Sequence, residues 1–102
     1  MKVWDISVLI VEDEKILRTI YHKLLKDSIK KLEFAENGLE GYDLFQKLKP
    51  DLVITDIKMP LMNGLDMVRK IKRLDSEARI VIMSAYGESH YFLRAIENGV
   101  NN

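Results

Sequence analysis

Short apolar runs alternate along the chain with stretches whose apolar residues recur at helical spacing. The runs Val8–Val11, Leu52–Thr55 and Ile80–Met83 predict buried strands, and the alternating segment Lys31–Glu36 predicts another. Helices are predicted by the apolar positions Ile16, Leu17, Ile20, Tyr21, Leu24 and Leu25; Leu44, Phe45 and Leu48; Leu65, Val68, Ile71 and Leu74; and Phe92, Ala95 and Ile96. Such alternation predicts an α/β fold, a mostly parallel sheet with helices on both faces.

Polar residues refine this pattern at the helix surfaces and helix ends. In the first predicted helix, Arg18, His22 and Lys23 are expected on the polar face, away from the sheet. The dipeptide Asn-Gly, usually a hairpin signal, occurs three times, but each copy borders a helical pattern. We therefore expect all three at loop or cap positions.

Composition excludes several classes of function. The 102 residues suit one compact domain, which we expect to span residues 1–102. Lys and Arg (16) balance Asp and Glu (16), so there is no general attraction to nucleic acid or to an anionic membrane. Cysteine is absent, and the apolar run at the start is too short for a signal or membrane segment. These features predict a cytoplasmic location and no direct binding of nucleic acid or membrane.

Acidic residues follow two of the predicted strands. Glu12 and Asp13 come directly after the first run, and Asp56 directly after Leu52–Thr55. If both runs are parallel strands, these carboxylates converge at the carboxyl edge of the sheet, where open α/β folds place their ligands. Three crowded carboxylates repel one another, and a hard cation such as Mg²⁺ offsets that cost. An Asp beside such an ion can accept a phosphoryl group.

Each of these residues also has a simpler interpretation. Asp13, with Glu14 and Glu12, could cap the following helix and complement its dipole. Asp56 could form a turn, and Ser84 after the run at 80–83 could be a turn or N-cap residue. Their coincidence at one edge of the sheet favours a phosphoryl-transfer site, because several separate requirements of such a site are then met together.

Three segments resemble the receiver domain of bacterial two-component response regulators. They are Glu12-Asp13, the stretch Asp-Ile-Lys-Met-Pro-Leu-Met-Asn-Gly at 56–64, and Met83-Ser84-Ala85. The similarity spans essentially the whole chain, and the stretch at 56–64 is its most specific part. It implies a flavodoxin-like doubly wound sheet of strand order 2-1-3-4-5, with the site at the carboxyl edge.

The resemblance also implies roles for individual residues. Asp56 would be the phosphoacceptor, phosphorylated by a sensor histidine kinase or a phosphotransfer protein. Mg²⁺ would be bound by Glu12, Asp13, Asp56 and the backbone carbonyl of Lys58. Such a phosphoprotein is a signalling switch rather than an enzyme.

Two further roles concern the phosphorylated state. The Ser84 hydroxyl and the Ala85 backbone N–H would bind the phosphoryl group, and movement of Ser84 would signal to an output partner or effector domain. Lys58 and Tyr86 would flank the route of hydrolytic water, so a bulky Tyr86 is expected to lengthen the lifetime of the acyl phosphate.

The resemblance also implies a fifth strand, a phosphoryl-binding lysine and a fifth helix, which residues 1–102 do not include. We therefore expect a receiver domain shortened at its C-terminus. The run Ile80–Met83 would then be an exposed sheet edge, and exposed edges favour self-association of the chain.

Two other functions are compatible with such a fold. One is a protein-binding module that acts without phosphorylation. The other is an aspartate-nucleophile phosphohydrolase of the haloacid dehalogenase type, which requires Asp-x-Asp after its first strand. Here Lys15 follows Asp13 at the position of the second acid, which argues against the phosphohydrolase.

Overall fold

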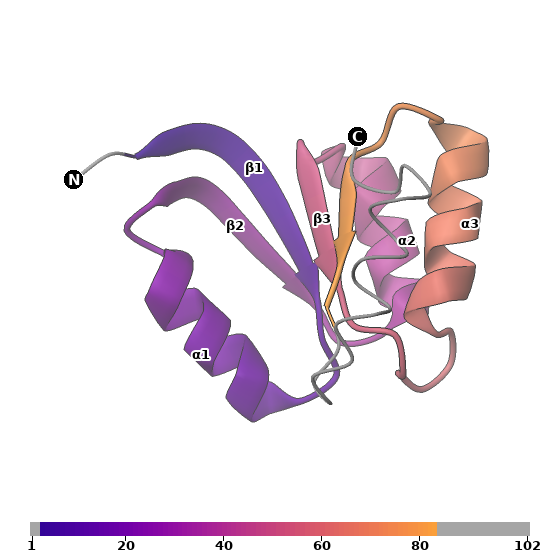
Figure 1. Cartoon of the computed structure of the whole chain (residues 1–102), viewed down its shortest axis with the longest axis horizontal. Helices are drawn as coiled ribbons and strands as arrows, with labels where there is room; N and C mark the ends of the chain where they lie inside the picture. Colours follow the sequence, from indigo (N-terminus) through magenta and orange to yellow (C-terminus); the bar gives the residue numbers. More distant parts are fainter. Residues whose placement is uncertain (1–2, 84–102) are drawn as a thin grey trace.

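Within residues 3–83, which the computed structural model describes, four strands form one sheet and three helices connect them (Figure 1). The elements are β1 (Trp4–Val11), α1 (Lys15–Leu25), β2 (Ile29–Ala35), α2 (Gly38–Leu48), β3 (Leu52–Thr55), α3 (Gly64–Leu74) and β4 (Ile80–Ile82). The strand order is β2-β1-β3-β4, and neighbouring strands are parallel. The structure thus confirms the flavodoxin-like order for the strands that it describes.

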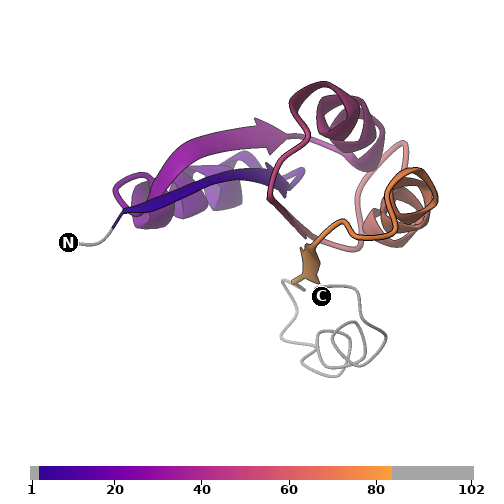
Figure 2. The same ribbon diagram turned by 90° about the horizontal axis from the view of Figure 1, so that it is seen from above.

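The helices cover opposite faces of the sheet. Helices α2 and α3 lie side by side (Figures 1 and 2), over a core to which the sheet contributes Leu9, Val11 and Val53. On the other face, the ring of Phe34 in β2 lies 6.1 Å from the ring of His22 in α1. This division follows from right-handed crossovers. The chain moves along the sheet in one direction from β1 to β2 and in the opposite direction from β2 to β3, so the connecting helices α1 and α2 lie on opposite faces.

Two Asn-Gly pairs mark the starts of helices, as the sequence predicted. The side chains of Asn37 and Asn63 cap α2 and α3, and each accepts a hydrogen bond of 2.8 Å from the backbone N–H three residues later, on Glu40 and Asp66. The third pair lies outside the described residues, as does the predicted final helix.

Strand β1 is longer than its apolar run. It begins at Trp4, four residues earlier than predicted, and Trp4 pairs with Ile29 at the start of β2. Ser7 within this extension donates hydrogen bonds from its N–H and its hydroxyl to Asp51 Oδ2, at 2.8 and 3.1 Å. The local apolar pattern did not reveal the extension because its partners are distant in sequence.

Helix α1 presents a narrower apolar face to the sheet than predicted. Its half-buried apolar residues, spaced four apart, are Leu17, Tyr21 and Leu25. Other apolar residues assigned to the same face are exposed, namely Ile16, Ile20 and Leu24. The placement of Arg18 on the polar face was wrong: its side chain is only 17% exposed, because its guanidinium group reaches back to the end of β1.

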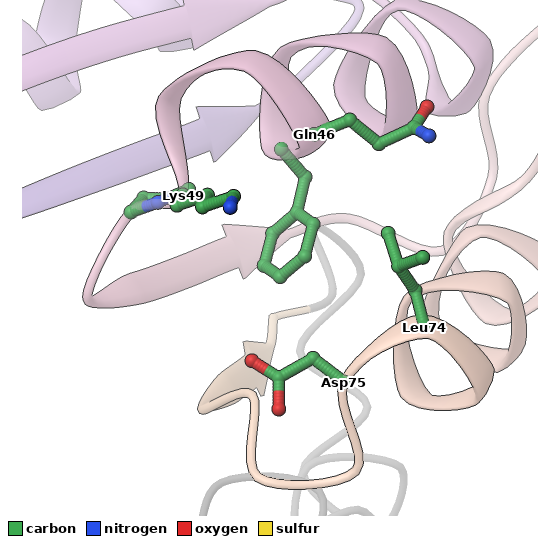
Figure 3. A pocket seen from close by; sticks show the side chains of 6 residues that line it. Gln46, Lys49, Leu74 and Asp75 are labelled. Atoms are coloured by element: carbon green, nitrogen blue, oxygen red, sulfur yellow. The ribbon is translucent and has the colours of Figure 1, made fainter.

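A surface cavity of about 450 Å³ opens where α2 and α3 end (Figure 3). Its lining consists of Phe45, Gln46, Lys49, Pro50, Leu74 and Asp75. Because the helices run against the strands, this cavity lies at the amino edge of the sheet and contains none of the acids predicted to form a site. No helix within residues 3–83 is long and apolar enough to cross a membrane.

Candidate metal centre

The ends of β1 and β3 bring three carboxylates together. The Glu12 N–H donates to the Ala35 carbonyl of β2 at 2.9 Å, and the Asp56 N–H donates to the Val11 carbonyl of β1 at 3.2 Å. Glu12, Asp13 and Asp56 therefore follow adjacent strands at the carboxyl edge of the sheet. One oxygen from each carboxylate lies within 4.8 Å of the others, which is close enough to share a cation.

Burial and mutual repulsion disfavour charge in this acidic cluster. Glu12 is 3% exposed, and burial, together with the charge of Asp56, raises its pKa from 4.5 to about 7. Burial also raises the pKa of Asp56, and the charges of Asp13 and Glu14 raise it further. Hydrogen bonds from backbone N–H groups oppose these shifts only in part. A cation bound between these carboxylates would offset the cost of ionising them.

We expect the stability of the metal-free protein to fall as the pH rises from about 5 to about 8. Because the pKa of Glu12 is about 7 in the folded state and near 4.5 in the unfolded state, the folded state binds more protons in this range. Urea unfolding in the presence of a chelator measures the effect. Glu12→Gln should show a weaker pH dependence than the parent. An equal slope in both proteins would contradict the assignment to Glu12.

Helix capping explains only part of this arrangement. The N-cap residue of α1 is Glu14, whose side chain makes no capping hydrogen bond, while the Glu12 carboxylate accepts one from the Glu14 N–H at 3.1 Å. Capping thus accounts for one contact of Glu12 but not for the approach of Asp56 from another strand. The donor set is composed of carboxylate oxygens, which suits a hard cation such as Mg²⁺.

The backbone around Asp56 is fixed by its neighbours. Its carbonyl accepts a hydrogen bond of 2.8 Å from the buried Thr55 hydroxyl, and its Oδ1 accepts one of 2.7 Å from the Ile57 N–H. The Ile57 carbonyl accepts the N–H of Gly64 at 2.7 Å, which closes the intervening loop. A Cβ on Gly64 would overlap the Asp56 carbonyl oxygen, so this approach requires glycine.

The loop at 57–63 also packs against the start of α2. The Gly38 N–H donates to the Met62 carbonyl at 2.9 Å, and a Cβ on Gly38 would overlap that carbonyl. Within the loop, the Met62 N–H donates to the Pro60 carbonyl at 2.7 Å, across Leu61 with φ 67°. This is a γ-turn of the strained, positive-φ kind, and it gives the loop a defined shape.

Of the other predicted site residues, only Lys58 lies within the described residues 3–83. Lys58 is exposed in the loop after Asp56, and the role of its carbonyl stays a prediction. Ser84, Ala85 and Tyr86 lie outside the described residues. Sequence reasoning missed Arg18, because its contact with the Glu12 carbonyl depends on the path of the chain after β1 and not on its place in the helical pattern.

The family model for the response regulator receiver domain matches residues 8–102. The chain belongs to this family. A receiver domain accepts phosphoryl groups in two-component signalling, so this protein is a signalling domain rather than a classical enzyme. The match decides against the haloacid dehalogenase alternative.

Individual relatives agree with this assignment. The receiver domain is 38% identical to the chemotaxis protein CheY of Thermotoga maritima, over 93% of this chain and 80% of the relative. It is 36% identical to sporulation initiation phosphotransferase F of Bacillus subtilis, over 80% of this chain and 66% of the relative. It superposes with a TM-score of 0.76 on the response regulator TrrA of Thermotoga maritima, solved in complex with Mg²⁺ and BeF, at 31% identity over 94% of this chain and 80% of that one.

Proposed function

We propose that Asp56 is the phosphoacceptor of this receiver domain and that Glu12, Asp13 and Asp56 bind Mg²⁺ together with the backbone carbonyl of Lys58. The observation that carries the proposal is the approach of three carboxylate oxygens to within 4.8 Å, at the edge where β1 and β3 end. The raised pKa values of Glu12 and Asp56 support it, because they reflect buried negative charge that a divalent cation would offset.

The local geometry suits Asp56 for nucleophilic attack. The Ile57 N–H holds Oδ1, which orients the carboxylate, and an Asp56 oxygen then attacks phosphorus. The new O–P bond forms an acyl phosphate as the bond from phosphorus to the donor nitrogen breaks, and the imidazole of the donor histidine leaves. Mg²⁺ held by these carboxylates would offset their charge and that of the transferring phosphoryl group.

The donor in this scheme is a sensor histidine kinase or a phosphotransfer protein, and the recipient of the signal is an output partner or effector domain. Ser84 and the Ala85 N–H bind the phosphoryl group, and Lys58 and Tyr86 set its lifetime. These roles rest on the family resemblance of the motifs that contain the residues.

Asp13→Asn tests the metal site. We expect Mg²⁺ affinity to fall roughly tenfold or more, because the number of charged ligands sets the affinity of such sites. Isothermal titration with Mg²⁺ measures the change. Asp43→Asn is the matched control, since Asp43 is exposed on α2, and it should bind like the parent.

Two results would contradict the proposal. Equal Mg²⁺ affinity of Asp13→Asn and the parent would remove Asp13 from the metal site. The second result is normal Mg²⁺ binding but no labelling by a small phosphodonor, in a receiver domain that includes the expected fifth strand and helix. It would favour the binding module that acts without phosphorylation.

A further inference from the structure

The guanidinium group of Arg18 connects the ends of two strands beside the acidic cluster. Its Nη1 donates to the carbonyl of Glu12 at 2.7 Å, and its Nη2 lies 3.3 Å from Glu36 Oε1, just after β2. The Arg18 side chain is 17% exposed. A charge so covered by protein requires satisfied hydrogen bonds, and charge-assisted bonds of this kind are short and directional.

The contact with the Glu12 carbonyl bears directly on Asp13. This carbonyl belongs to the planar peptide unit between Glu12 and Asp13, so its direction determines how the chain enters Asp13. The Glu12 carboxylate is restrained separately, by the Glu14 N–H at 3.1 Å. Arg18 therefore acts on the placement of Asp13, whereas Glu14 acts on the placement of Glu12.

Within residues 3–83, few other side-chain contacts hold this end of α1. None of its residues, all of which are described, is fully buried, and the N-cap Glu14 lacks a side-chain capping bond. The Arg18 backbone N–H donates to the Glu14 carbonyl at 3.0 Å, and its guanidinium group donates to the Glu12 carbonyl at 2.7 Å. Arg18 therefore connects the first turn of α1 to the segment that precedes the helix. The path from Glu12 to Glu14 thus depends strongly on Arg18.

We propose that Arg18 is a positioning residue that sets the separation of the Asp13 and Asp56 carboxylates and thereby the affinity for Mg²⁺. This inference rests on the proposed metal site. The contact with the Glu12 carbonyl carries the effect, because the Glu36 carboxylate is 65% exposed and exposed ion pairs contribute little.

Charge and positioning predict opposite effects of removing Arg18. Loss of a nearby positive charge by itself would strengthen Mg²⁺ binding, whereas loss of the restraint on Asp13 would weaken it. We expect Arg18→Ala to weaken Mg²⁺ binding about tenfold or more, the range seen when groups that orient metal ligands are removed. Glu36→Gln is the matched control and should change affinity less than about twofold.

Calorimetric titration with Mg²⁺ and amide NMR spectra of the metal-free protein provide independent measurements. The Asp13 amide signal should shift in Arg18→Ala and stay in place in Glu36→Gln. Arg18→Lys should show intermediate affinity, because an ammonium group can donate to the Glu12 carbonyl but cannot reproduce the planar fork. If the alanine variant does not fold, Arg18→Lys provides the test. Weaker Mg²⁺ binding than in the parent, at a thermal midpoint close to that of the parent, would support the positioning role.

A folded variant with parental affinity and an unshifted Asp13 amide would overturn the positioning role, as would tighter Mg²⁺ binding. If the parent itself bound no Mg²⁺, the proposed metal site would fail, and the inference about Arg18 would fail with it.

Discussion

Asp56→Asn will abolish acyl-phosphate formation in a receiver domain that includes the expected fifth strand and helix. The amide retains the size of the carboxylate and can still accept the Ile57 N–H, but it lacks the nucleophilic oxygen. The same change should raise the thermal midpoint of the metal-free protein at neutral pH, because it removes a charge that burial and the carboxylates of Asp13 and Glu14 disfavour. Labelling with a radioactive small phosphodonor and Mg²⁺ measures the first effect.

Asp43→Asn is the control for this experiment and should be labelled like the parent, since Asp43 is an exposed carboxylate on α2. Glu12→Gln should slow labelling without abolishing it, because Glu12 is proposed as a metal ligand and not as the acceptor. Labelling of Asp56→Asn at the parental rate would show that another residue is the acceptor.

Gly64→Ala will destabilise the domain by more than about 3 kcal/mol, which is beyond the range of most point mutations. The added methyl group would overlap the carbonyl oxygen of Asp56, which also accepts a hydrogen bond from the Thr55 hydroxyl. Alanine favours the helix over glycine by about 1 kcal/mol, and this gain partly offsets the steric cost in the measured change. Urea unfolding gives the change in free energy.

Gly41→Ala provides a graded comparison. A Cβ at Gly41 would meet the Met67 Sδ at 2.7 Å and a Val11 methyl group at 2.9 Å, and a flexible side chain such as Met67 can move. The loss should therefore be smaller than at Gly64, and Mg²⁺ affinity should be retained. Equal losses at the two positions would mean that the Asp56 carbonyl can move out of the way.

The order of elements and the convergence of acids could be predicted because both depend on local patterns. Short apolar runs mark the strands of a parallel sheet, and parallel topology then requires Glu12 and Asp56 to meet at one edge. The caps at Asn37 and Asn63 were likewise visible, because the capping residue directly precedes the helix that it stabilises.

Features that depend on contacts distant in sequence could not be predicted in this way. The extension of β1 depends on Asp51, which is 44 residues from Ser7. The partial burial of Arg18 depends on the path of β1 after Val11, which helical periodicity does not report. The close packing of Gly64 against Asp56 follows from the shape of the loop and not from either residue type.

The loop between Asp56 and Gly64 has a consequence for how its sequence can vary. Surface loops usually accept inserted residues, because their ends are free to adjust. Here the Ile57 carbonyl and the Gly64 N–H bond directly, and the Met62 carbonyl is bound by α2. An added or deleted residue would break at least one of these bonds. Variation should therefore occur by exchange of side chains at constant length. The side chain of Leu61 is largely in solvent, but its φ of 67° limits the exchange there to residues that accept this backbone conformation.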